Sequence, residues 1–335
     1  MQRRTFNLLV AGAAVSATAA GAVLLTSDRY ISPAPPGQRA LPDLAGKLGD
    51  LAWIRISRGT MTINFALIAG HWTVVEKGNF PAAEERIHKL LGALAAVELV
   101  EPRTGRAELL PRLDLDDPAN GKSTLVVLQG RAGAQVGALI VGRSRPSTLG
   151  GGDAGVYVRK PGTDQAWLAR GSFDLSGDVL DWIDRHIIDL HAEQIASIVL
   201  TASDGSAVII SRTAPDAAFA IEGSAAVPNA KNAALLAGAL TALDLDDVKP
   251  AAEQPIPMDG AATAAFTSFD GLVVGARFSP PGAADWLALD ITGSGKAEDD
   301  AKALNARLSK WSFRIPPERA KLLRMTLADL QPNGS

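Results

Sequence analysis

The chain has 335 residues, of which 47% are hydrophobic, and a formal net charge of −3. This length predicts about two domains, and with no basic block beyond one arginine pair, nucleic-acid binding is not expected. Cysteine is absent, which excludes disulfides, thiolate metal sites, iron–sulfur clusters and cysteine nucleophiles.

Residues 1–27 have the pattern of a signal or anchor segment. Arg3 and Arg4 precede an uncharged run, residues 5–27, that is rich in Ala, Val and Leu. A positive start before an apolar stretch directs export and leaves the N-terminus in the cytoplasm. The arginine pair partly matches a twin-arginine signal, and the general secretory route is the alternative.

The fate of this segment is open between retention and cleavage. As a helix, the 23-residue run would be about 34 Å long, enough to cross a bilayer core of about 30 Å. This length favours a hydrophobic helix retained as a single-pass anchor in the inner (cytoplasmic) membrane, with the body in the periplasm. The small residues Ala20-Gly21-Ala22 satisfy a cleavage rule, and cleavage near Ala22 would release a soluble periplasmic protein.

A linker is predicted over residues 28–43. Four prolines lie between Pro33 and Pro42, and such a segment is typically extended and stiff. Folded sequence is therefore expected from Leu44 onward.

Two units follow, predicted over 44–192 and 193–335, and the same pattern opens both. Each begins with a strand, a turn, a returning strand, a shorter strand and a helix that opens near a proline. In the first unit these segments are 53–56, 60–68, 71–75 and a helix opened by 79–81; in the second they are 195–200, 207–211, 218–221 and a helix opened by 227–228.

The later parts of the two units also correspond. Further hairpin strands are predicted at 124–128, 136–141, 156–158 and 166–168, and again at 264–267, 272–278 and 286–289. A helix is expected to end each unit, at 179–189 and at 297–311. The sequence predicts an α+β protein: a tandem duplication of an antiparallel-sheet-plus-helix unit, preceded by one N-terminal hydrophobic helix.

Three motifs invite a ligand, and each fails a structural requirement. The stretch Leu113–Asp117 recurs as Leu243–Asp247, but neither copy has the spacing or the distal Glu of a calcium loop. Gly150, Gly152 and Gly155 match G-x-G-x-x-G, but a strand is expected after them where the dinucleotide fingerprint requires a helix. The segment 292–296 lacks the earlier glycine of a phosphate loop and is expected to be a turn before the last helix. No metal or cofactor is therefore expected.

The four histidines suggest no catalytic set. His186 is expected on a helix near its C-terminus, and none of His71, His88, His186 and His191 stands in a G-x-S-x-G setting. The six tryptophans are spread through both units and are expected to be core anchors. No catalytic residue is predicted and no enzyme activity is expected, although a hydrolase whose partners meet only in space is an open alternative.

Longer stretches resemble the bacterial family known as domain of unknown function 4340. The resemblance lies in "HWTVVEKGNFPAAEERIHKLLGALAAVELVEP", "LDLDDP", the run to "YVRK", "WIDRHIIDLHAEQIASIVL" and "LNARLSKWSFRIPPERAKLLRMTLADL", and covers roughly Leu44 to Leu330. It implies a single N-terminal membrane span, a body outside the cytoplasmic membrane, and a link with ABC-type transport systems resembling those of gliding motility. It supplies no catalytic residues.

The sequence and the resemblance together predict a membrane-anchored periplasmic accessory or scaffold protein. Its partners would be inner-membrane proteins such as transporter subunits, with the membrane itself bound through residues 5–27. Exposed strand edges could recruit a partner strand, and residues 311–317 with the terminal helix could dock a partner. The alternative is a soluble periplasmic module that binds a glycan or lipid fragment between its two units.

Overall fold

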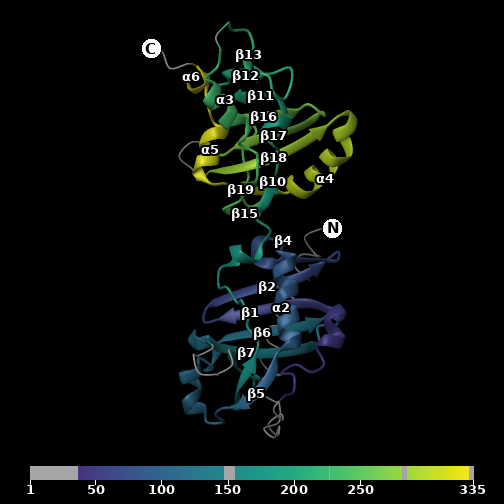
Figure 1. Cartoon of the computed structure of the whole chain (residues 1–335), viewed down its shortest axis with the longest axis vertical. Helices are drawn as coiled ribbons and strands as arrows, with labels where there is room; N and C mark the ends of the chain where they lie inside the picture. Colours follow the sequence, from purple (N-terminus) through teal and green to yellow (C-terminus); the bar gives the residue numbers. More distant parts are fainter. Residues whose placement is uncertain (1–36, 147–154, 226, 281–284, 332–335) are drawn as a thin grey trace. The chain divides into compact units, whose positions relative to one another are not determined.

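The computed structural model describes residues 37–146, 155–225, 227–280 and 285–331, and the chain divides into two units between Asp184 and Arg185. Each unit is built on a large antiparallel sheet with helices, so the expected mixed α+β class is confirmed (Figure 1). None of the helices in the described ranges is long and apolar enough to span a membrane. The predicted hydrophobic helix, residues 5–27, lies outside those ranges.

The first unit contains a nine-stranded sheet in the order β4-β3-β2-β1-β6-β7-β8-β9-β5, in which all neighbours are antiparallel. Alternate residues of β1 and β6, such as Ile54, Ile56, Val126 and Leu128, are buried on one face. The strands are β1 (Leu51–Arg58), β2 (Met61–Ile68), β3 (His71–Val74), β4 (Phe80–Pro81), β5 (Glu98–Pro102), β6 (Thr124–Gly130), β7 (Gln135–Arg145), β8 (Gly155–Arg159) and β9 (Ala166–Arg170).

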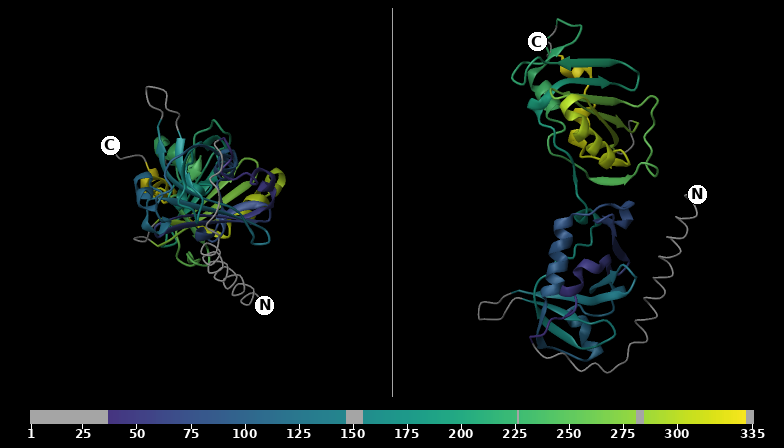
Figure 2. Two further views of the ribbon diagram at one scale, coloured as in Figure 1. Left: turned by 90° about the horizontal axis from the view of Figure 1, so that it is seen from below. Right: turned by 90° about the vertical axis from the view of Figure 1, so that its right-hand side faces the viewer.

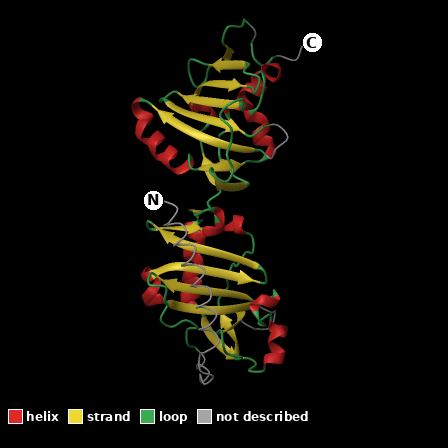
Figure 3. Ribbon diagram, turned by 180° about the vertical axis from the view of Figure 1, so that it is seen from behind, coloured by secondary structure: helices red, strands yellow, loops and turns green. Residues whose placement is uncertain are grey.

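Helix α2 (Glu84–Ala96) connects the two opposite edges of this sheet. It leaves β4 at one edge and delivers the chain to β5 at the other, so it runs across the strands (Figures 1 and 3). Figure 2 (right) shows the helix on one side of the sheet. The stripe predicted from helical spacing is its buried face: Ile87, Leu90, Leu91, Leu94 and Ala95.

The start of α2 differs from the prediction. Phe80 and Pro81 do not open the helix but form the short edge strand β4, which pairs with β3. The Ala82 N–H then donates to the Trp72 carbonyl oxygen (2.8 Å), so the chain stays extended until Glu84. Proline suits such an edge because it has no N–H to contribute to a further strand.

Trp182 lies near the C-terminal end of the first unit and packs into its core. Its side chain is fully buried, its ring meets Phe65 edge-on at 5.2 Å, and its Nε1–H donates to the Ser176 carbonyl oxygen (3.0 Å). The helix predicted over 179–189 is wrong: only Val179–Trp182 turns, as the 3₁₀ segment η5, and the Asp178 side chain accepts the Leu180 N–H at its start. The Ala83 N–H bonds to the Trp182 carbonyl oxygen (2.8 Å), which ties this segment to the start of α2.

The described part of the predicted linker, residues 37–43, is packed on the first sheet. The Ala40 N–H donates to the Val97 carbonyl oxygen (2.9 Å) and Arg39 bridges to Glu98, so residues 37–40 cover the outer edge at β5. Ala40 and Leu41 are buried. The folded part therefore begins before Leu44, because these residues satisfy backbone groups at the outer edge of β5.

The second unit contains an eight-stranded sheet in the order β13-β12-β11-β16-β17-β18-β19-β15. Helix α3 (Ala230–Ala237) lies between β13 and β15 in the chain, which are again the opposite edges of the sheet. The strands are β11 (Ile195–Thr201), β12 (Ala207–Ser211), β13 (Ala220–Ile221), β15 (Asp247–Pro250), β16 (Thr263–Ser268), β17 (Leu272–Phe278), β18 (Trp286–Gly293) and β19 (Trp311–Arg314).

The last helices also differ from the prediction. Helix α4 (Glu298–Leu308) ends before Trp311, and Trp311 begins β19, which lies between β18 and β15. Phe313 is fully buried, as are Ala320 and Leu323 of α5 (Pro317–Leu323), so the suggested docking element 311–317 contributes some of its residues to the core. The chain ends its described part with α6 (Leu327–Leu330).

A two-stranded ribbon explains where the units divide. Strand β10 (His186–Ile188) pairs with β14 (Leu243–Asp244), far ahead in the sequence, so residues 185–192 belong with the second unit. The division falls after residue 184 rather than after residue 192. Sequence periodicity could not reveal this, because a three-residue strand shows no measurable alternation.

Replacement of Trp182 tests its role as the anchor of the first unit. Trp182→Ala is expected to lower the unfolding free energy of this unit by about 3–5 kcal/mol, because it removes a fully buried aromatic side chain. Trp182→Phe keeps most of the packing and loses the hydrogen bond to Ser176, so we expect a loss of about 1 kcal/mol. Hydrogen exchange of unit-1 peptides measures both losses, and similar small losses would contradict the anchor role.

Candidate functional site

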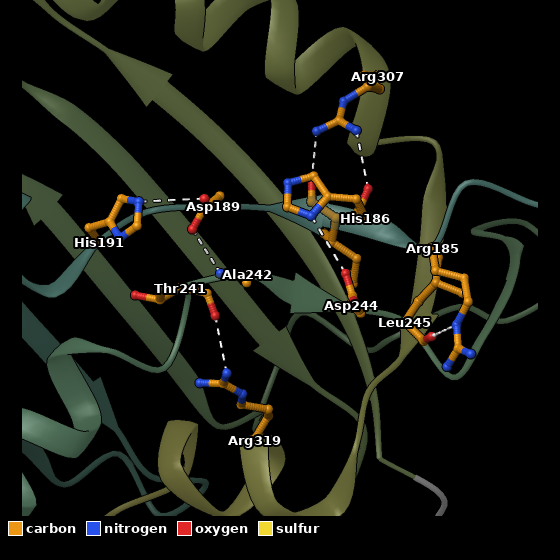
Figure 4. A network of polar contacts seen from close by, with 11 residues as sticks. Arg185, His186, Asp189, His191, Thr241, Ala242, Asp244, Leu245, Arg307 and Arg319 are labelled. Atoms are coloured by element: carbon orange, nitrogen blue, oxygen red, sulfur yellow. Dashed lines mark hydrogen bonds and ion pairs between the residues drawn. The ribbon is translucent and has the colours of Figure 1, made fainter. Parts of the chain in front are cut away.

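The histidines of the second unit lie on the β10–β14 ribbon and its flanks (Figure 4). His186 is opposite Asp244 across the ribbon, with its Nδ1 3.5 Å from the Asp244 carboxylate. Both side chains are about half exposed (46% and 58%). The predicted helical position of His186 is therefore wrong, and strand pairing brings it to an aspartate that is distant in sequence.

A second histidine–aspartate pair stands on the same ribbon. His191 Nε2 is 3.5 Å from the Asp189 carboxylate. The same carboxylate accepts a hydrogen bond from the Ala242 N–H (2.8 Å). Ala242 has a φ of 44°, the left-handed region that β-carbon-bearing residues rarely adopt. Asp189 therefore stabilises the tight turn that leads into β14.

Three arginines, two of them on helices, complete this network by binding main-chain oxygens. Arg307 of α4 donates to the carbonyl oxygens of His186 (3.3 Å) and Ile187 (2.5 Å). Arg319 of α5 donates to those of Gly238 (3.0 Å) and Thr241 (3.1 Å), and Arg185 Nε donates to that of Leu245 (3.0 Å). Figure 4 shows these side chains converging on the ribbon from both sides.

The hydrogen bonds of this network hold its segments together, and we call the network the brace. In a catalytic triad, a histidine–aspartate pair activates a nucleophile that is hydrogen-bonded to the histidine. The hydroxyl drawn in the network, that of Thr241, donates to the Leu190 carbonyl oxygen (3.1 Å). The arrangement therefore fixes β10 and β14 to α4 and α5.

The two acidic repeats fold differently. In the second, Asp244, Asp246 and Asp247 face separate basic side chains: His186, Arg185 and Arg314. The first lies before β6, where Asp117 caps a 3₁₀ turn, η4 (Pro118–Asn120), by accepting the Ala119 N–H (3.0 Å). Over the described ranges, no three acidic or histidine side chains gather closely enough to hold a metal ion.

The other two motifs lie next to strands. Gly150 and Gly152 lie outside the described residues, and Gly155 begins β8. The turn expected over 292–296 before the last helix is shorter, because the first two residues of this segment end β18. Only its later part turns, at the start of the 3₁₀ segment η7 (Gly295–Ala297) before α4, with Gly295 at a φ of 60°.

The first unit carries a polar hollow of about 250 Å³ beside a bulge in β7. The register between β7 and β8 shifts between Val141 and Ser144, which places Gly142 and Arg143 in the bulge. Cations from three segments line the hollow, namely Arg58 at the end of β1, Lys122 before β6, and Arg143. We call it the basic pocket; its acidic lining residue is Asp114.

Glycine at position 142 makes this geometry possible. A β-carbon there would lie 2.8 Å from the Asp114 carbonyl oxygen and even closer to that of Leu113. Asp114 itself has a φ of 54° at the end of the 3₁₀ segment η3 (Ala107–Leu113). The loop that carries Asp114 can thus approach the bulge only because residue 142 has no side chain.

A larger and more apolar groove of about 470 Å³ lies along α2. Leu51, Leu67, Trp72 and Leu91 contribute to its walls, together with Glu84 and His88 of the helix. Just outside it, His71 Nδ1 is 3.0 Å from the Glu84 carboxylate, and both side chains are well exposed (76% and 43%). A pair so exposed adds little stability.

Sequence reasoning did not find the basic pocket. Arg58, Lys122 and Arg143 are separated by many residues, and only the antiparallel pairing of β1, β6 and β7 brings them together. Gly142, a glycine next to an arginine within an apolar strand, is the one local signal, since such a glycine suggests a bulge or a close backbone approach.

In a comparison with known protein families, residues 72–257 match the family described as Domain of unknown function (DUF4340). The match covers more than half of the chain. The protein belongs to the DUF4340 family. The matched region begins in β3 and ends after β15, so this family segment includes α2, the basic residues Lys122 and Arg143, and the β10–β14 ribbon. No curated protein and no solved structure matches the chain.

The brace can be tested by comparing two substitutions in the second unit. Arg307→Gln removes a guanidinium bound to two carbonyl oxygens and is expected to lower the local unfolding free energy by about 1–3 kcal/mol. Asp244→Asn breaks only a half-exposed ion pair and should cost less than about 1 kcal/mol. Hydrogen exchange of unit-2 peptides provides the comparison. A larger loss for Asp244→Asn would show that the histidine–aspartate pair is more than a surface contact.

The close approach at the bulge predicts a difference between two glycines of β7. Gly142→Ala should destabilise the first unit by about 1–3 kcal/mol or more, because the new methyl group overlaps backbone oxygens that cannot move independently. Gly137→Ala is the matched control, since the atoms nearest its β-carbon would be side-chain carbons of Leu41, at 3.4–3.5 Å, and of Leu128, at 3.9 Å. Urea denaturation compares the two variants. Equal midpoints would mean that the Asp114 loop is free to shift.

Proposed function

We propose that this DUF4340 protein is a membrane-anchored periplasmic accessory or scaffold protein without catalytic activity. In this proposal residues 5–27 span the inner membrane once, and both units lie in the periplasm. They hold partner proteins of an ABC-type envelope transport system, as the family resemblance suggests.

The observation that carries the proposal is the short distance between the apolar segment and the first sheet. Only residues 28–36 separate the uncharged run from the segment 37–40, which is hydrogen-bonded to the edge of the nine-stranded sheet. Nine residues extend over at most about 32 Å. An anchor at residues 5–27 would therefore hold the first unit close to the membrane surface, where transporter subunits project.

We also infer that the two units arose by tandem duplication. In support, β1, β2, β3, β6, β7, β8, β9 and β5 of the first sheet have the same order as β11, β12, β13, β16, β17, β18, β19 and β15 of the second. A helix crosses from edge to edge in both sheets. In each unit the segment that enters it also pairs near the last edge strand: β10 pairs with β14, just before β15, and residues 37–40 pair with β5. Two related surfaces on one anchored chain suit a scaffold that holds similar partners.

Isolation from native membranes tests the proposal. The C-terminus is tagged, the membranes are crosslinked and mildly solubilised, and mass spectrometry identifies the copurified proteins and the mature N-terminus. We expect an intact residue 1–27 segment, recovery in the membrane fraction and transporter subunits among the partners. As a control, a form in which a cleavable signal replaces residues 1–27 should be soluble.

A soluble, partner-free protein that begins at Val23 would overturn the proposal. That result would instead favour the soluble periplasmic module that binds a glycan or lipid fragment.

A further inference from the structure

We propose that the basic pocket of the first unit binds the phosphate group of an anionic phospholipid headgroup. The phosphate chemistry follows from the pocket itself, and the lipid source rests on the proposed membrane anchor. The three cations of the pocket have no ion-pair partner among the described residues, and only one carboxylate, that of Asp114, lines it. Unpaired cations that converge on one hollow repel each other, and an anion relieves that repulsion.

Arg58 is held in place for such a ligand. Its Nε donates to Thr124 Oγ1 (2.9 Å) and one terminal nitrogen donates to the Leu175 carbonyl oxygen (3.0 Å). These neutral acceptors fix the guanidinium without neutralising it, and the other terminal nitrogen keeps its donors. A planar, preorganised guanidinium matches phosphate oxygens and loses little entropy on binding.

The other two cations provide adjustable charge at the rim. Arg143 is exposed on the bulge, and its guanidinium lies 5.8 Å from the centre of the Tyr157 ring. Lys122 is exposed just before β6. The volume of about 250 Å³ is below that of sites for drug-sized molecules, about 300–1,000 Å³, and suits a single headgroup.

Strand register places the pocket near the point where the chain leaves toward the proposed anchor. Val156, which lines the pocket, is paired with Ala169 of β9, and Ala169 is paired with Leu99 of β5. The Leu99 carbonyl oxygen accepts the Gly37 N–H (2.6 Å). Gly37 is thus three strand spacings, or about 14 Å, from a wall of the pocket. A short tether that starts there would keep the pocket within reach of headgroups.

The second unit lacks the fixed arginine. Strand β16 has the same place in its sheet as β6, but its first residue, Thr263, is paired on the β11 side with Thr201, so no arginine of β11 takes the place of Arg58 there. The arginine paired with Thr263 is Arg277 of β17, on the opposite side of β16. The basic pocket is therefore a property of the unit next to the proposed anchor, and sheet architecture alone does not require it.

The test is calorimetric titration of the full chain in a neutral detergent with two soluble probes. Glycerophosphoglycerol is the phosphodiester headgroup of phosphatidylglycerol without its acyl chains, and inorganic phosphate represents a free anion. We expect the headgroup to bind, with an affinity that falls as ionic strength rises and the screening length shortens from about 30 Å at 0.01 M to about 8 Å at 0.15 M.

The pocket variant is Lys122→Gln with Arg143→Gln, both at exposed positions that should leave the fold intact. The dissociation constant for the headgroup is expected to rise about tenfold or more. The matched control, Lys47→Gln with Arg131→Gln, removes the same two types of charge from exposed positions of the first unit outside the pocket. It should change the constant less than about twofold.

Each outcome decides a separate point. If the pocket variant loses binding and the control variant does not, the basic pocket is supported as the binding site. A preference for inorganic phosphate over the headgroup would overturn the lipid assignment. Binding of neither probe, or equal losses in both variants, would overturn the pocket itself. Because both probes are soluble, these results do not depend on membrane anchoring, which the isolation from native membranes tests independently.

Discussion

The packing of a crossing helix against an antiparallel sheet is the constraint on which the rest of the first unit depends. Because α2 carries the chain from one edge strand to the other, its apolar stripe must cover the sheet along the way. Burial of Ile87, Leu90, Leu91 and Leu94 supplies the hydrophobic stabilisation that holds β5 at the far edge. That edge in turn accepts residues 37–40, so the entry of the chain is fixed by the same helix.

Edges are the recurring problem of such sheets, and this chain covers them in different ways. Residues 37–40 cover β5, and β4 is only two residues long and contains Pro81. In the first sheet the Asn64 N–H, on the outer side of β2, donates to the Glu76 carboxylate. Coverage of this kind limits unspecific strand pairing. It makes recruitment of a partner through an open edge less favourable than binding in a groove or pocket.

The charged groups fall into two sets: those that stabilise the fold and those that remain available to bind a ligand. Arg307, Arg319 and Arg185 bind carbonyl oxygens, and Asp189 holds a left-handed turn, so these charges maintain the geometry of the second unit. The cations of the basic pocket are arranged differently, because one is fixed by neutral acceptors and two remain exposed. This contrast is the reason to look for a ligand in the first unit.

The α+β class, the buried stripe of α2 and most hairpin strands could be predicted from the sequence, because burial on one face leaves a period in the chain. It also carried the pattern of apolar residues, prolines and tryptophans by which the DUF4340 family is recognised. Three features could be read only from the folded chain: His186 lies on a strand, residues 37–40 cover an edge, and Arg58, Lys122 and Arg143 line one pocket. Short strands have no period, and pairing between distant segments depends on register, which no local pattern encodes.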